Sequence, residues 1–187
     1  MFPLNVPNVL TVVRILLIPV IVVALLGETE NADTIAAVVF AVAAFTDGLD
    51  GYIARSRGSI TNFGKLMDPL ADKLLIIAPL ISLVSLERIP AWVAMVIIAR
   101  ELAVTMLRIV AVERGVVIPA SWLGKAKTIL QVAAIFAVIA FDGSAAADAL
   151  LYAAVAVTLV SGADYFFGVR RHMERARREA SARRRTL

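Results

Sequence analysis

Residues 34–53 read TIAAVVFAVAAFTDGLDGYI, an apolar run that is interrupted near its end by Asp47 and Asp50. A helix of about 20 residues crosses the ~30 Å hydrocarbon layer of a bilayer, so this run is long enough to span a membrane. A carboxylate within that layer costs free energy, and ionisable groups there usually serve a function. The segment therefore predicts a membrane helix whose acidic end takes part in chemistry.

Five other runs share this length and character, at residues 8–27, 68–86, 89–111, 123–141 and 149–169. Hydrophobic residues make up 60% of the 187-residue chain and charged residues 18%, whereas soluble domains are about 45–50% apolar and about 25% charged. The composition excludes an ordinary soluble domain and a disordered chain. The absence of Cys excludes thiol chemistry and thiolate metal sites. We expect an all-α integral membrane protein, with six transmembrane helices in one bundle that forms a catalytic domain over residues 1–169.

Charges outside the runs predict how the chain is oriented. The connections 28–33, 87–88 and 142–148 carry six acidic residues and one base, whereas the opposite connections and the C-terminus are basic. Because basic residues collect on the cytoplasmic side, both termini are expected to be cytoplasmic, in the inner membrane of a bacterium.

Residues 170–187 hold eight Arg and two Glu, and we expect them to form a basic cytoplasmic tail. The rest of the chain has 11 basic and 13 acidic residues, so the net charge of +4 comes from this tail. Clustered arginines beside a membrane attract anionic lipid headgroups. The high pI therefore indicates contact with membrane lipids rather than with nucleic acid.

Every run contains ionisable residues, for example Arg14 in the first and Arg100 with Glu101 in the fourth. With the expected orientation, nearly all of them fall in the cytoplasmic half of the bilayer. We therefore expect one polar cavity that opens to the cytoplasm beneath an apolar outer half. A divalent-cation transporter is the alternative from another functional class, but it would place polar groups along the whole depth.

Four aspartates form the most informative pattern. Asp47 and Asp50 are three residues apart, and Asp68 and Asp72 are four apart, so each pair shares one helical face. A short basic connection between the two helices brings the pairs together. Four carboxylates repel one another unless cations neutralise them, and oxygen ligands favour Mg²⁺ or Mn²⁺. Two such ions are suited to phosphoryl transfer.

Small residues and one arginine accompany the aspartates. Gly51 and Ala54 lie one turn after Asp47 and Asp50 and leave room for a ligand against the helix, and Gly64 lies one turn before Asp68. Arg55 offers a forked donor suited to a diphosphate.

The pattern Asp47-x2-Asp50-Gly51-x2-Ala54-Arg55-x8-Gly64-x3-Asp68-x3-Asp72 resembles the complete signature of the CDP-alcohol phosphotransferases, integral-membrane enzymes of phospholipid synthesis. Eight fixed positions match over 26 residues without a departure. Looser motifs, at residues 7–14, 99–102 and 124–131, are similar to those of the bacterial phosphatidylglycerophosphate synthases in that family.

This resemblance implies the roles of the site residues. Asp47, Asp50 and Asp68 would be the principal metal ligands, and Asp72 would bridge the metals or act as the general base. The donor would be CDP-diacylglycerol, and the protein would be a homodimer. The residues expected at the donor site are Asn8, Thr11, Gly51, Ala54, Arg55, Thr61 and Gly64.

An anionic acceptor, which the resemblance implies to be glycerol 3-phosphate, needs a basic pocket of its own. We predict that Arg108 and Lys125 hold the acceptor phosphate, together with Lys127 or Arg100. The other interpretation is that the lysines only anchor the end of a membrane helix and that Arg100 only neutralises a buried acid. The signature describes the donor half of the reaction, so inositol phosphate, serine or another alcohol stays open as the acceptor.

Overall fold

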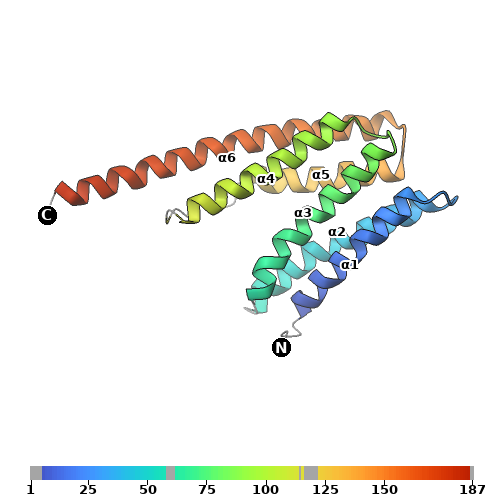
Figure 1. The fold of residues 1–187 in the computed structure, drawn as a ribbon, viewed down its shortest axis with the longest axis horizontal. Helices are drawn as coiled ribbons and strands as arrows, with labels where there is room; N and C mark the ends of the chain where they lie inside the picture. The colour runs from blue at the N-terminus through green and yellow to red at the C-terminus, as the bar shows by residue number, and fades with distance from the viewer. Residues whose placement is uncertain (1–5, 58–61, 114, 116–121, 186–187) are drawn as a thin grey trace.

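The computed structural model describes residues 6–57, 62–113, 115 and 122–185, and the side chains of residues 8–46, 67–113, 115 and 122–174 within them. The described residues form six helices: α1 (Val6–Leu26), α2 (Ala32–Arg57), α3 (Asn62–Ser85), α4 (Ala91–Glu113), α5 (Trp122–Ala140) and α6 (Ala145–Arg185). Figure 1 shows their arrangement. The predicted all-α class is confirmed.

Each predicted run corresponds to one helix, and three helices extend four or more residues beyond the predicted bounds. α2 continues to Arg57, α3 begins at Asn62, and α6 continues without a break from the last predicted run to Arg185. Hydropathy marks only the part of a helix that suits the membrane interior, whereas backbone hydrogen bonding continues into polar sequence. The link between α5 and α6 turns at Gly143, whose φ of 71° is accessible to glycine at little cost.

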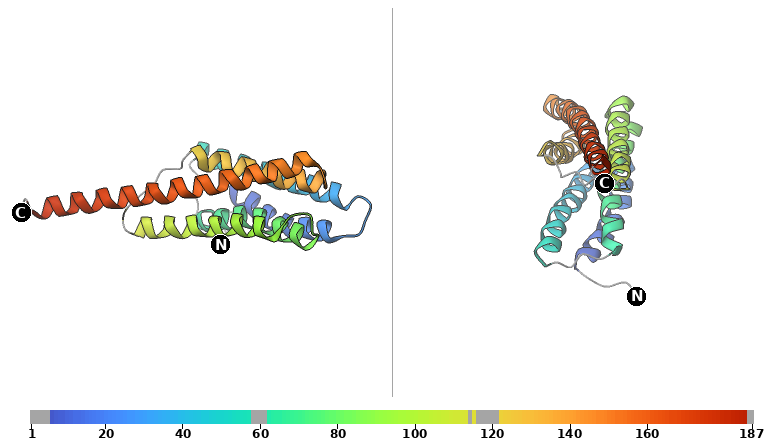
Figure 2. Two further views of the ribbon diagram at one scale, coloured as in Figure 1. Left: turned by 90° about the horizontal axis from the view of Figure 1, so that it is seen from above. Right: turned by 90° about the vertical axis from the view of Figure 1, so that its left-hand side faces the viewer.

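The helices form two groups of three. α1 packs against α2 and α3, and α6 packs against α4 and α5, while α2·α5, α3·α4 and α3·α5 contacts join the groups. Figure 1 shows the groups close together at the end that holds the links α1–α2, α3–α4 and α5–α6 and spread apart at the other end, and Figure 2 shows α6 running on past the bundle. We call these the linked end and the open end.

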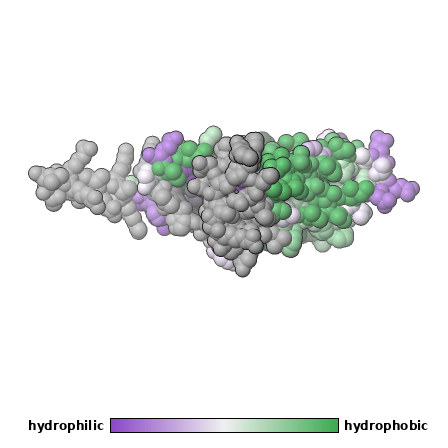
Figure 3. All heavy atoms as spheres, turned by 90° about the horizontal axis from the view of Figure 1, so that it is seen from below, coloured by the Kyte–Doolittle hydropathy of each residue, from purple (hydrophilic) through white to green (hydrophobic). Residues whose placement is uncertain are grey.

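Apolar side chains cover both the interior and the surface. The core contains Phe40, Leu80, Leu83, Ile97 and Ile139, all fully or almost fully buried. The exposed surface also carries many large apolar residues, and Figure 3 shows apolar surface over the described residues next to the linked end, with hydrophilic residues at its tip. Such continuous exposed apolar area is typical of a surface that faces lipid.

Three described segments are long and apolar enough to cross a membrane: Asn8–Leu26, Trp122–Ala140 and Ala145–Glu174. This supports a multi-pass membrane protein. That all six helices cross the bilayer stays a prediction, as does the cytoplasmic direction of the open end.

One arginine of the α3–α4 link joins the start of α2 to the α5–α6 link at the linked end. Arg88, in the α3–α4 link, donates to both carboxylate oxygens of Asp33, at 2.8 and 2.9 Å, and its Nε lies 3.2 Å from Asp142 Oδ2. The hydrogen bonds to Asp33 raise the pKa of the Arg88 guanidinium above its usual range. Arg88 is the one base that the sequence places among six acids in these links, and its contacts give that base a structural role.

Arg88→Ala is expected to lower the melting temperature in detergent by about 2–4 °C. For a chain of this size, this corresponds to a loss of about 1 kcal/mol in the free energy of unfolding. The loss is modest because both carboxylates are about half exposed and water screens the ion pairs. Thermal unfolding followed by circular dichroism measures it. Glu28→Gln is the matched control, since it removes an exposed charge from the same end, and an equal shift in both variants would contradict the assigned role of Arg88.

Candidate functional site

Helix α1 donates a hydrogen bond to each of the two aspartates of α3 whose side chains are described. Thr11 Oγ1 donates to Asp68 Oδ1 at 2.5 Å, and Arg14 Nη1 donates to Asp72 Oδ1 at 2.7 Å. Thr11 and Arg14 are one turn apart on α1, and Asp68 and Asp72 are one turn apart on α3. The packing of α1 on α3 therefore sets the positions of both carboxylates.

The Arg14–Asp72 ion pair is asymmetric. The Arg14 side chain is 0% exposed and that of Asp72 is 49% exposed. Arg14 thus reaches Asp72 from the protein interior, while the carboxylate is accessible from a cavity that it helps to line. A charge-assisted hydrogen bond of this kind orients the carboxylate.

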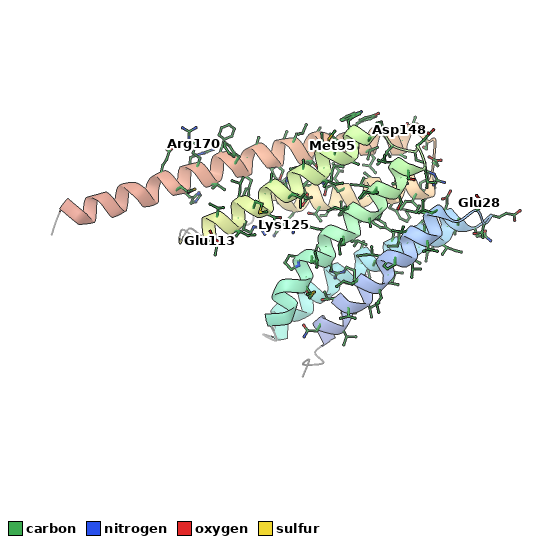
Figure 4. All side chains as sticks on the ribbon, viewed as in Figure 1. Glu28, Met95, Glu113, Lys125, Asp148 and Arg170 are labelled. Carbon is green, nitrogen blue, oxygen red and sulfur yellow. The ribbon has the colours of Figure 1, made fainter. Side chains whose placement is uncertain are left out.

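The cavity has a volume of about 700 Å³, which is large enough for a small phosphate ester. Helices α2 to α6 all contribute to its wall. Figure 4 places Lys125 on the part of α5 nearest the open end. The polar and charged residues that line the cavity are Asp72, Lys73, Arg100, Glu101, Thr105, Arg108, Lys125, Lys127, Thr128, Gln131 and Tyr165.

Glu101 is the centre of a buried charge network in this cavity. Its Oε1 atom accepts a short hydrogen bond from Lys127 Nζ and lies 3.4 Å from Arg100 Nη1. Arg100 Nη2 in turn donates to Ser161 Oγ at 2.8 Å. The network connects α4, α5 and α6, and the Lys127 and Arg100 side chains are only 7% and 11% exposed.

A glycine on α6 makes room for this network. A Cβ atom at Gly162 would lie 3.1 Å from Arg100 Cγ, closer than side chains normally pack. Nearby, Gln131 Nε2 donates to Thr158 Oγ1 at 2.9 Å and joins α5 to α6. Small and hydroxyl-bearing residues of α6 therefore allow a large cation to lie between two helices.

Two further cations of the cavity are more accessible. Arg108 lies 5.9 Å from the centre of the Tyr165 ring, and Lys125 is exposed. Neither forms an ion pair with a carboxylate among the described side chains. With five cationic residues and two acidic ones in its lining, the cavity is suited to an anion.

The structure brings part of the predicted site together. The four residues predicted for the acceptor phosphate, Arg100, Arg108, Lys125 and Lys127, line one cavity with Asp72. The predicted donor-site residues Asn8 and Thr11 are buried on α1, and Thr11 contacts Asp68.

Other predicted residues lie where the structure does not describe their side chains or, for Thr61, their position. Asp47, Asp50, Gly51, Ala54 and Arg55 belong to α2 and Gly64 to α3 by their backbone alone. Among the described side chains, no group of three His, Cys, Asp or Glu could hold a metal. The metal site and the donor site therefore stay predictions.

Sequence reasoning missed three roles. It noted Arg14 only as a charge in an apolar run, and it did not anticipate the pairing with Asp72. It considered a buried acid as the partner of Arg100 but did not anticipate that Lys127 shares Glu101 with it. An acid next to a base in an apolar run was the available signal for Glu101, whereas nothing in the sequence marks Ser161.

Comparisons with known proteins identify the family of this chain. The family model of CDP-alcohol phosphatidyltransferases matches residues 4–160. The CDP-diacylglycerol–glycerol-3-phosphate 3-phosphatidyltransferase of Bacillus subtilis (strain 168) is 43% identical, with 87% of this chain and 93% of the relative covered. A probable phosphatidylglycerophosphate synthase of Mycobacterium tuberculosis (strain ATCC 25618 / H37Rv) is 42% identical over 95% of this chain and 87% of the relative. A Rickettsia felis protein with the same name as the Bacillus one is 37% identical over 87% of this chain and 93% of the relative.

Proposed function

The chain belongs to the CDP-alcohol phosphatidyltransferase family, and from this premise we propose that it transfers the phosphatidyl group of CDP-diacylglycerol to glycerol 3-phosphate and releases CMP. The observation that carries the proposal is the cavity, which combines Asp72 with five cationic side chains in a space that suits a small anionic acceptor. The names of relatives that align with most of the chain support the same donor and acceptor.

Two divalent cations, Mg²⁺ or Mn²⁺, are proposed as cofactors. Asp68 and Asp72 offer carboxylate oxygens one turn apart on α3, and hydrogen bonds from α1 hold one oxygen of each. Asp47 and Asp50 belong to α2, which packs against α3. This oxygen-only donor set fits a hard cation. When bound, the ions would stabilise negative charge on the diphosphate of the donor.

The remaining chemistry is assigned to side chains. Asp72 accepts the proton of the glycerol 1-hydroxyl as that oxygen bonds to the phosphatidyl phosphorus and the bond to CMP breaks. Arg14 holds Asp72 in place, and Arg108 with Lys125 binds the acceptor phosphate. Arg55 balances the charge on the departing nucleotide, in a donor site with Asn8, Thr11, Gly51, Ala54, Thr61 and Gly64.

The proposed location is the bacterial inner membrane, with both termini and the open end of the bundle in the cytoplasm. Glycerol 3-phosphate is water-soluble and would enter from that side, while the acyl chains of the donor stay in the lipid. The basic residues beyond position 169 would contact anionic headgroups. We propose a homodimer as the working assembly.

An acceptor panel tests the function. Purified protein in detergent with CDP-diacylglycerol and Mg²⁺ or Mn²⁺ is expected to release CMP with glycerol 3-phosphate, and to stop when a chelator removes the divalent ions. Release with inositol phosphate or serine in place of glycerol 3-phosphate would reassign the acceptor. No release with any acceptor would contradict the proposed activity and favour ion transport.

Lys125→Ala is expected to raise the KM for glycerol 3-phosphate by about 10-fold or more and to change the KM for CDP-diacylglycerol little, because an accessible charge–phosphate contact is worth about 1.5–3 kcal/mol. Initial rates of CMP release give both constants. Arg170→Ala is the matched control, since Arg170 is an exposed cation on α6 that pairs with Glu174 outside the cavity. Equal rises in both KM values would indicate a general disturbance instead.

A further inference from the structure

The Glu101 carboxylate uses only one of its two oxygens in the charge network. Oε1 interacts with both Lys127 and Arg100, whereas Oε2 has no hydrogen-bond partner among the described residues. Oε2 is also not among the buried atoms that lack a partner, so it is accessible, and Glu101 lines the cavity. An accessible carboxylate oxygen is therefore available to a bound molecule.

Neutralisation of the neighbouring cations does not by itself explain why Glu101 lines the cavity. Two cations share the one carboxylate, so the group of three keeps a positive charge, and a carboxylate in a cavity for an anion weakens the binding of that anion. Its accessible oxygen is an acceptor only, and it suits a neutral hydroxyl group. Arginine and lysine side chains cannot accept a hydrogen bond, so they cannot take this role.

The cations divide into two sets by depth. Arg108 and Lys125 are exposed and form no ion pair with a described carboxylate, so they suit the phosphate. Arg100 and Lys127 are nearly buried and are held by Glu101. A molecule whose phosphate binds to the exposed Arg108 and Lys125 would therefore present its other polar groups to Glu101.

A second polar atom in the cavity lining also lacks a partner. Gln131 Oε1 is buried without a hydrogen bond, and Gln131 lies one turn beyond Lys127 on α5. Because that oxygen is buried, it does not face a bound molecule, and the accessible acceptor in this part of the cavity wall is Glu101 Oε2.

We propose that Glu101 determines specificity for the acceptor: Oε2 accepts a hydrogen bond from the 2-hydroxyl of glycerol 3-phosphate, while Lys127 and Arg100 hold the carboxylate in position through Oε1. This inference rests on the proposed function. It assigns the two ends of the acceptor to different residues, with the phosphate at Arg108 and Lys125 and the 2-hydroxyl at Glu101.

The test compares two acceptors in each variant. 3-Hydroxypropyl phosphate keeps the phosphate and the attacking primary hydroxyl of glycerol 3-phosphate but lacks the 2-hydroxyl. The wild-type kcat/KM is expected to be about 10- to 100-fold higher for glycerol 3-phosphate than for 3-hydroxypropyl phosphate. This is the effect expected from one hydrogen bond to a charged group. In Glu101→Ala this ratio is expected to fall to about 1, because both acceptors then lack the same contact.

Two further variants complete the design. Glu101→Gln keeps a neutral acceptor atom, so its ratio of kcat/KM for the two acceptors is expected to be intermediate. If Glu101→Ala no longer binds CDP-diacylglycerol, Glu101→Gln is used for the test instead. Ser161→Ala is the control, since it removes the hydrogen bond to Arg100 but no group that faces the acceptor, and its ratio is expected to equal that of the wild type.

A ratio that stays at the wild-type value in both Glu101 variants would overturn the inference, as would a wild-type enzyme that uses both acceptors equally well. Absence of CMP release by the wild type with either acceptor is a different result, because it would contradict the proposed function itself.

Discussion

Asp72→Asn is expected to reduce CMP release by about 10²–10⁴-fold while CDP-diacylglycerol binding stays measurable. An asparagine oxygen can still accept the hydrogen bond from Arg14, so the local packing of α1 on α3 survives. Asparagine cannot take the proton of the attacking hydroxyl, and loss of a general base costs this much. Initial rates of CMP release and equilibrium binding of the donor measure the two effects separately.

The matched control is Asp164→Asn, which removes an exposed carboxylate of α6 that does not line the cavity. This variant is expected to keep wild-type rates. Normal turnover by Asp72→Asn would show that another group accepts the proton, and loss of donor binding would assign Asp72 to the donor instead.

Arg14→Gln is expected to lower kcat by about 10- to 100-fold, the effect of losing one hydrogen bond to a charged group. Arg14 touches Asp72 from the interior, so it acts by positioning that carboxylate rather than by contacting substrate. The free energy of unfolding is expected to fall by about 1–3 kcal/mol, since water can solvate the half-exposed Asp72 in the variant. Steady-state kinetics and thermal unfolding in detergent report the two quantities.

Arg14→Lys separates charge from geometry. Lysine keeps the positive charge but lacks the planar guanidinium, so kcat is expected to lie between those of the wild type and Arg14→Gln. Arg88→Ala serves as the comparison, because it lowers stability at the linked end without touching the cavity. If Arg14→Gln lowered the melting temperature but left kcat unchanged, Arg14 would be structural only.

The helices were predictable because each corresponds to an apolar run of about 20 residues in the sequence. The predicted run 123–141 differs from α5 (Trp122–Ala140) by one residue at each end. The prediction stopped too early at the polar end of α2 and after residue 169 in α6, since helical hydrogen bonding does not require apolar side chains. The hydropathy pattern also did not show that the helices would separate into two groups.

The sequence alone determined the helical class, the spacing of the four aspartates and the basic character of the fourth and fifth runs, because these depend on residues close together in the chain. Only the tertiary structure decided that Arg14 would meet Asp72, 58 residues away, and that Lys127 would reach Glu101 while Arg108 and Lys125 stay accessible. Such pairings depend on how each helix is rotated about its axis and where it crosses its neighbours. Packing of the whole bundle sets both, and no local pattern contains that information.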